Sequence, residues 1–319
     1  MRVKIGHHKQ QIKKLLLIDG IARTGKTLLS KIIPSLKNFE QVEFCEFLEY
    51  ILAGLHLKKI KYDYASSLIH QLLNEIGYNK LIGRKQNFRF KDLTSVKNFK
   101  NLKVYEKRLL KNEGNKIFNE LKNTNNYFPL MTHDVMVNFS HFKKINLNCK
   151  MIQIYREPCD IIHSWYMRGF GYRWQVDPGT FDILTNYKNN LYPWYIAEKE
   201  HVWKKMNYVE RCTKIVLDLI NRSISNHKKN KSNKKILTIT YENFLQETNY
   251  ELKKICKFLN TSRTSFTDKI LKKENCPAKY NYEKHIVKKK FIKRNINKKL
   301  FGDLEETSEK YKKLYNLLN

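Results

Sequence analysis

The chain has 319 residues, of which 62 are Lys or Arg and 30 are Asp or Glu, giving a formal net charge of +32 at pH 7. This length is enough for one large domain with a full core, and neither an internal repeat nor a Pro- or Gly-rich linker divides the chain, so we expect residues 1–319 to form a single domain. Six cysteines without a C-x-x-C pair, no apolar run of membrane-spanning length and no signal-peptide core exclude a disulfide framework and a membrane span, and favour a cytoplasmic protein.

The first predicted elements are a strand, a loop and a helix between residues 14 and 34. Residues 15–18 are a continuous apolar run, typical of a strand buried on both faces of a parallel sheet. Residues 20–27 read G-I-A-R-T-G-K-T, the spacing of a phosphate-binding loop, and apolar residues at helical spacing follow until Pro34. Inward-facing backbone N–H groups in this context predict a site for an anion of phosphate size.

The remaining elements alternate between strands and helices. Short apolar runs predict strands at residues 41–45, 128–132, 151–155 and 235–240. Helical spacing predicts helices at 46–57, 65–76, 160–167, 197–208 and 211–226, a helical excursion at about 60–125 and a basic helical segment at about 280–319. This alternation predicts an α/β fold, a parallel sheet flanked by helices on both faces, with its ligand site at the carboxyl ends of the strands.

Three predicted strand ends carry residues suited to phosphate chemistry: residues 23–27, His133, and Arg156 with Ser164. Strand ends of a doubly wound sheet lie along one edge, so these residues could converge on one crevice. Arg156 and Ser164 are eight positions apart, so both could reach a second phosphate. Taken alone, Arg156 fits a surface helix-capping arginine, and Ser164 an ordinary helical serine, at least as well.

Three segments resemble parts of the sulfotransferase family. Residues 21–29, IARTGKTLL, resemble its 5′-phosphosulfate loop, and residues 155–165, YREPCDIIHSW, resemble its 3′-phosphate motif, with Arg and Ser at the same step. Residues 236–260 are similar to the family's strand, Tyr-Glu-x-Leu segment and following helix. The pieces occur in the family's order and cover much of residues 14–260.

The resemblance implies a P-loop-like α/β sulfotransferase that moves a sulfuryl group from 3′-phosphoadenosine 5′-phosphosulfate (PAPS) to a hydroxyl or amine acceptor, with a carbohydrate or another hydroxyl compound as a candidate. It places Arg23 at the bridge between donor and leaving phosphate, and Arg156 and Ser164 at the 3′-phosphate. The residues it assigns to the 5′-phosphosulfate loop are Thr24, Gly25, Lys26, Thr27 and Leu28.

The implied chemistry is an in-line displacement in which charge builds on the leaving phosphate. Arg23 and Lys26 would neutralise that charge, so no metal is expected. For the base that takes the acceptor's proton, His133 resembles the catalytic histidine of cytosolic sulfotransferases, and Glu46 resembles the glutamate base of tyrosylprotein sulfotransferases. A capping or core-polar role for both residues stays open.

One aromatic segment and one basic segment are further candidates for the predicted site. Residues 165–181 concentrate aromatics, glycines and arginines, which fits either a cap over the acceptor or a helix end with buried aromatics. The family's C-terminal Arg-Lys-Gly segment has no match in this chain. The basic run at 284–299 could take its place or be a solvated helix.

The competing interpretation is a kinase or NTPase that uses ATP and magnesium. Lys26 favours it, because the sulfotransferase loop usually has Thr or a small residue there, and residues 214–218 fit a Walker-B strand as well as a helix. A polyanion-binding protein is favoured by charge alone. Codon drift in an AT-rich genome or an anionic cofactor explains that charge without nucleic acid, and without a DNA- or RNA-binding motif we expect no specific nucleic-acid partner.

Overall fold

The computed structural model describes the backbone of residues 3–318 and the side chains of residues 3–314. Within this range five parallel strands form the central sheet, in the order β2–β3–β1–β4–β7. They are β1 (Leu15–Asp19), β2 (Glu43–Phe44), β3 (Phe128–Met131), β4 (Cys149–Tyr155) and β7 (Ile236–Thr240). Each predicted strand overlaps one of them, and the predicted α/β fold is confirmed.

Helices cover both faces of the sheet because alternate residues of β1 point to opposite sides. Leu16 and Ile18 belong to an apolar cluster with the helices of one face, and Leu15 and Leu17 belong to a second cluster with the helices of the other. The first face carries α1 (Lys26–Ile32), α10 (Tyr241–Gln246), α11 (Thr248–Leu259) and α12 (Ser265–Lys273). The second carries α2 (Glu46–His56), α3 (Tyr62–Leu81), α5 (Asn115–Asn123) and α6 (Phe139–Ile145), and α4 (Leu102–Leu109) lies between α3 and α5 in the chain.

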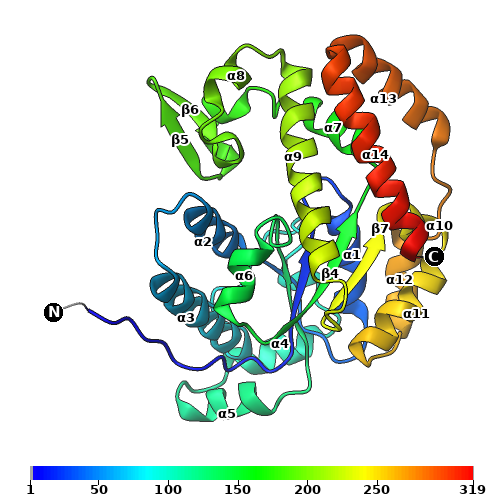
Figure 1. Ribbon diagram of the computed structural model, residues 1–319. Coiled ribbons are helices and arrows are strands. Elements are labelled where there is room, and N and C mark those ends of the chain that lie inside the picture. The colour runs from blue at the N-terminus through cyan, green and yellow to red at the C-terminus, as the bar shows by residue number, and fades with distance from the viewer. Residues whose placement is uncertain (1–2, 319) are drawn as a thin grey trace.

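A third apolar cluster lies beyond the carboxyl ends of the strands (Figure 1). Its elements are α7 (Pro158–Tyr166), α8 (Glu200–Lys204), α9 (Tyr208–Lys229), α13 (Tyr282–Asn295), α14 (Lys298–Leu318) and the antiparallel hairpin of β5 (Leu184–Tyr187) and β6 (Asn190–Pro193). Segments distant in sequence therefore meet above the sheet edge where the ligand site is predicted.

The structure differs from the sequence-based expectations in three places. Residues 214–218 lie inside α9, so of the two alternatives for this segment the helix is correct and the Walker-B strand is not. The helix predicted at 197–208 is reduced to α8, because Asn207 and Glu210 form a capping box that starts α9. The β5–β6 hairpin was not predicted; its turn at Lys188 and Asn189 has positive φ at both residues, as a type I′ hairpin turn requires. No helix of the described chain is long and apolar enough to cross a membrane.

Candidate active site

The loop between β1 and α1 is shaped by its two glycines. Gly20 and Gly25 have φ of +153° and +103°, and Arg23 between them has φ of +74°. A Cβ atom on Gly20 would lie 2.5 Å from the backbone oxygen of Ile154, so only glycine fits where the loop passes β4. Both glycines of the predicted motif therefore have a steric role in the loop.

Lys26 opens α1, and its side chain folds back into the loop. The residue is 4% exposed, and Nζ donates to the backbone oxygens of Gly20 and Ile21, the latter at 2.8 Å. Burial lowers the pKa of Lys26 to about 8, although nearby carboxylates oppose the shift. The ammonium group of Lys26 thus lies buried against the loop, hydrogen-bonded to its backbone oxygens.

The other predicted loop residues differ in their surroundings. Thr24 is buried, and its hydroxyl donates to the backbone oxygen of Ile21 at 2.9 Å. Thr27 is exposed and Leu28 is half-buried. Thr24 therefore stabilises the turn, whereas the side chain of Thr27 is open to solvent.

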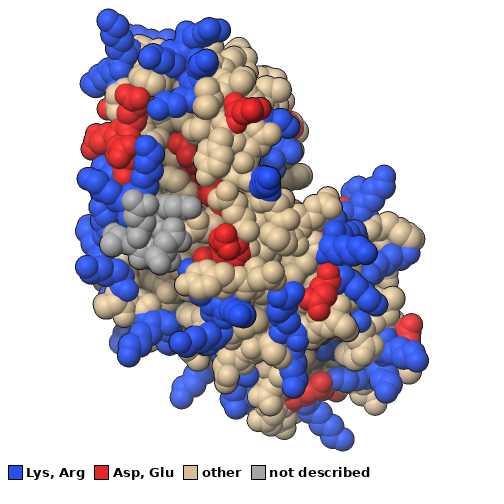
Figure 2. Space-filling model, turned by 90° about the vertical axis from the view of Figure 1, so that its right-hand side faces the viewer, with Lys and Arg blue, Asp and Glu red and all other residues tan. Residues whose placement is uncertain are grey.

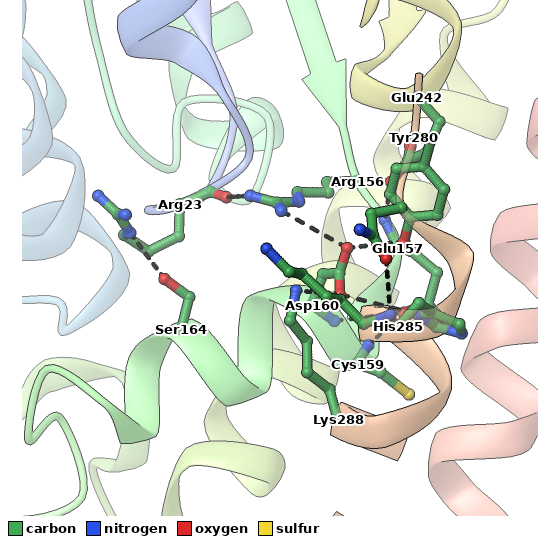
Figure 3. A network of polar contacts seen from close by, with 12 residues as sticks. Arg23, Arg156, Glu157, Cys159, Asp160, Ser164, Glu242, Tyr280, His285 and Lys288 are labelled. Atoms are coloured by element: carbon green, nitrogen blue, oxygen red, sulfur yellow. Dashed lines mark hydrogen bonds and ion pairs between the residues drawn. The ribbon is translucent and has the colours of Figure 1, made fainter. Parts of the chain in front are cut away.

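Arg23, Arg156 and Ser164 meet beside this loop, as the sequence predicted (Figure 3). Arg23 Nε donates to Ser164 Oγ at 2.9 Å, and Arg156 Nη1 donates to the backbone oxygen of Arg23 at 3.1 Å. The Arg156 guanidinium lies 4.4 Å from the centroid of the Tyr241 ring. Its Nε is buried and has no hydrogen-bond partner within the described part of the chain.

A pocket of about 510 Å³ opens over these residues. Its lining is mainly cationic, with one carboxylate: Arg23, Arg156, Asp160, His163, Ser164, Met167, Arg168 and Lys288. Burial lowers the pKa of Arg23, and the positive charges of Arg168 and Arg156 lower it further. Because these cations repel one another, an anion bound among them would relieve the repulsion.

Asp160 fixes α13 against the pocket. Its carboxylate is 2% exposed and accepts hydrogen bonds from Tyr280 Oη at 2.7 Å and Lys288 Nζ at 2.8 Å (Figure 3). Burial opposes ionisation, but His285, whose Nδ1 lies 3.7 Å from Asp160 Oδ1, and the hydrogen bonds from Lys288 and Tyr280 outweigh it and lower the pKa of Asp160. Lys288 is thus the member of the basic run at 284–299 that lines the pocket.

A second constellation lies at the carboxyl ends of β1 and β3. Asp19 accepts from Thr132 Oγ1 at 2.9 Å and from the backbone N–H groups of Val135 at 3.2 Å and Met136 at 2.8 Å. These bonds hold the turn after β3 against β1. The turn carries His133, which the sequence predicted to be at the site.

His133 is paired with Glu49 of α2. Glu49 Oε1 accepts from the backbone N–H of His133 at 2.6 Å and lies 2.9 Å from its Nδ1. Burial and then the charge of Lys26 lower the pKa of His133 to about 4, and burial raises the pKa of Glu49. Glu46 is the first residue of α2 and is exposed, so the carboxylate that meets His133 is one turn further along the helix.

The aromatic segment at 165–181 divides into a buried and an exposed part. Trp165 and Trp174 are buried with ring centroids 5.9 Å apart, and Trp165 Nε1 donates to the backbone oxygen of Ala22 at 3.0 Å. Phe181, in contrast, is 77% exposed. Trp165 therefore contacts the phosphate-binding loop through Ala22, whereas the side chain of Phe181 is open to solvent.

The sequence analysis assigned no role to Asp19 or Glu49, and Asp160 entered it only as part of the motif at residues 155–165. Asp19 ends the buried strand before the loop, and a charge in that position was a usable signal. Glu49 lies three residues after Glu46 on the same helix, so helical spacing could have offered it as an alternative. Lys288 had no signal that distinguishes it from the other lysines of α13.

Comparison with known proteins identifies one family. A sulfotransferase-domain model matches residues 13–314, whereas no curated protein sequence matches the chain. Among solved structures, the chain is similar to the sulfotransferase domain of the Synechococcus PCC 7002 olefin synthase, with 12% identity, 98% of each chain covered and a TM-score of 0.45. It is also similar to a sulfotransferase from Alicyclobacillus acidocaldarius, with 10% identity, 92% of this chain and 95% of that chain covered and a TM-score of 0.40. A third similar structure is mouse sulfotransferase SULT7A1 complexed with PAP, with 14% identity, 83% of this chain and 65% of that chain covered and a TM-score of 0.36.

Proposed function

The chain belongs to the sulfotransferase family, and from this premise we propose that it transfers a sulfuryl group from PAPS to a hydroxyl or amine acceptor. The observation that carries the choice of donor is the cationic pocket beside the phosphate-binding loop, lined by Arg156, whose buried Nε has no hydrogen-bond partner among the described residues. PAPS has phosphate groups at both its 5′ and 3′ positions. A loop and a separate cationic pocket side by side match that pair of anions.

Each part of the donor then has its own contacts. Thr24, Gly25, Lys26, Thr27 and Leu28 form the loop around the 5′-phosphosulfate. Arg156 and Ser164 bind the 3′-phosphate, since the guanidinium can donate two charge-assisted hydrogen bonds to one phosphate. Lys288 of α13 adds a further cation to this pocket and belongs to the basic run at 284–299, which the sequence offered in place of the family's C-terminal segment.

Arg23 and Lys26 neutralise the negative charge that develops on the leaving phosphate. Fixed cations aimed at developing negative charge lower the barrier of a displacement reaction. Lys26 Nζ already lies against the loop, so it would exchange a backbone oxygen for an oxygen of the bound donor. On this account the reaction proceeds with the chain's own cations and without a divalent metal ion.

The test is a transferase assay on the purified chain with PAPS in the presence of EDTA. A panel of alcohols, phenols and amines serves as acceptors, and release of adenosine 3′,5′-bisphosphate is followed by chromatography. We expect acceptor-dependent release that chelator leaves unchanged. Turnover that requires magnesium and ATP, without use of PAPS, would instead establish the kinase alternative that the Gly-Lys-Thr sequence favours.

A further inference from the structure

A cavity of about 850 Å³ lies outside the site described above, lined by α3, α5 and the segment that leads from the N-terminus into β1 (Figure 1). It shares no lining residue with the donor pocket. Residues 8 and 11 of its lining precede β1, whereas the phosphate-binding loop follows β1, so the two sites belong to opposite ends of a strand about 16 Å long. Cavities of this volume are typical of sites that bind small molecules.

Each of the two helices lines the cavity with one of its faces, on which residues recur three or four positions apart. On α3 these residues are Gln71, Asn74, Glu75, Tyr78 and Asn79. On α5 they are Asn115, Phe118, Asn119 and Lys122. Residues on the opposite faces, such as Ile69, Leu73 and Leu121, pack into the apolar core. Two helices therefore present polar and aromatic side chains to one shared space.

Amide side chains predominate in this lining: the two helices and Gln11 together supply six. Asn74 and Asn79 are only 6% and 7% exposed, and a buried amide is unfavourable unless it is hydrogen-bonded. Asn74 Oδ1 accepts from the backbone N–H of Gln11 at 2.8 Å, and its Nδ2 donates to the backbone oxygen of Lys9 at 3.1 Å. These bonds fix the N-terminal segment against α3, so this wall of the cavity is formed before a ligand binds.

The charges in the lining are mostly balanced. Glu113 forms an ion pair with Arg84, and Glu75 forms one with Lys85. The donor pocket, in contrast, combines three arginines and a lysine with a single carboxylate. The cavity is therefore poorly suited to an anion such as the donor. Its amide groups both donate and accept hydrogen bonds, which matches the hydroxyl groups of a neutral ligand.

Two aromatic rings form part of the same lining. Tyr78 of α3 and Phe118 of α5 are half-buried, with ring centroids 4.9 Å apart. Tyr78 Oη accepts from the backbone N–H of Gly114 at 2.9 Å, which holds its ring in place. The face of an aromatic ring is electron-rich and attracts C–H groups. A sugar ring has C–H groups on its faces and hydroxyl groups at its edge, so it complements both the rings and the amides.

We propose that this cavity binds a neutral saccharide, at a site separate from the donor pocket and independent of the proposed transferase activity. A sugar ring lies against Phe118 and Tyr78, and its hydroxyl groups bond to the amides of α3 and α5. Because the donor takes no part in this recognition, binding is measured on the full-length chain alone.

The test combines saturation-transfer difference NMR with calorimetry. The probes are maltotriose, cellotriose, mannotriose, galactotriose and chitotriose, with adenosine as a comparison ligand that also has an aromatic ring. We expect at least one trisaccharide to bind with a Kd of about 1 mM or tighter. Adenosine 3′,5′-bisphosphate should not displace it, because the two sites share no lining residue.

Variants on the two helices locate the binding. Gln71→Ala and Asn119→Ala each remove an exposed amide of the lining, so the fold should be kept, and each should weaken binding about 5- to 10-fold. Phe118→Ala removes a ring and should weaken binding at least about 10-fold. Asn123→Ala is the matched control, because Asn123 is an exposed asparagine of α5 that does not line the cavity, and its affinity should equal that of the wild type.

Several results would overturn the assignment. If no trisaccharide binds the wild type, or if Gln71→Ala and Asn119→Ala bind as tightly as the wild type, the cavity is not a saccharide site. If the bisphosphate displaces the trisaccharide, the sugar occupies the donor pocket instead. If adenosine binds more tightly than every trisaccharide and the same variants weaken it, the cavity is a nucleoside site.

Discussion

Arg156 has contacts that hold its guanidinium in place while leaving donors unused. Tyr241 lies under its face, Nη1 donates to the backbone of Arg23, and Asp160 lies 3.5 Å from Nη2. Nε remains buried without a partner among the described residues. A side chain fixed in this way loses little conformational freedom on binding, so its remaining N–H groups favour an anion with fixed geometry such as a phosphate.

Replacing Arg156 should therefore affect the 3′-phosphate alone. We expect Arg156→Ala to weaken binding of adenosine 3′,5′-bisphosphate by roughly 2–3 kcal/mol, the range for a hydrogen bond to a charged group, and to leave 5′-AMP binding nearly unchanged. Calorimetry with both nucleotides measures the difference. Arg89→Ala is the matched control, since the Arg89 side chain is 85% exposed. Equal losses for both nucleotides would show that Arg156 does not recognise the 3′ position.

Lys26 should impose a limit on activity at alkaline pH. The residue acts as a cation, and burial lowers its pKa to about 8, so the cationic form is complete below that pH and is lost as pH rises through it. We expect kcat/KM to fall above about pH 8. Lys26→Arg, which stays charged, should lack this fall, whereas Lys26→Ala should lower kcat by roughly two orders of magnitude, about 2.7 kcal/mol. If kcat/KM of Lys26→Arg still falls at alkaline pH as the wild type does, the fall is caused by another group.

At the level of elements, the sheet was predictable from the sequence and the outer layer was less so. Strands buried on both faces read as continuous apolar runs, and the positions of β1 and β4 follow directly. The β5–β6 hairpin is partly exposed and polar, so its pattern resembles a loop until the turn at Lys188 and Asn189 is considered. Exposed strands of four residues carry too few apolar positions to define a period.

The residues of the candidate site likewise divide into those that the sequence predicted and those that it did not. Arg23, Arg156 and Ser164 were predictable because a loop after β1 and a motif of fixed spacing after β4 carry them, with Ser164 inside α7. Lys288 was not, because its role depends on how α13 docks on Asp160 across 128 positions of sequence. Long-range ion pairs of this kind leave no periodic signal in the sequence.

The position of helix α13 beside the pocket leads to a prediction about its lysines. We expect Lys288→Ala to weaken bisphosphate binding about 5- to 10-fold, less than the arginine variant, because a partly exposed lysine is better screened by solvent. Lys290→Ala, an exposed lysine of the same helix, should have no effect. Calorimetry of both variants against the wild type measures this, and equal affinities for all three proteins would show that α13 takes no part in donor binding.

Across the whole molecule, positive charge is widespread and not confined to the site. Figure 2 shows Lys and Arg side chains distributed over the visible face, with fewer Asp and Glu between them. Such a surface attracts anions in general, and the attraction weakens as salt rises. Specific recognition of a donor must therefore come from the pocket around Arg156, in which charge and geometry are combined.

The central claim is that this pocket and the adjacent loop bind a nucleotide with phosphates at the 5′ and 3′ positions. The most direct measurement is calorimetry of the purified chain with adenosine 3′,5′-bisphosphate in EDTA, compared with ADP in excess magnesium. We expect the bisphosphate to bind at least about 30-fold more tightly, since one phosphate held by charge-assisted hydrogen bonds contributes about 2 kcal/mol. Tighter binding of ADP with magnesium, and no detectable binding of the bisphosphate, would contradict the account.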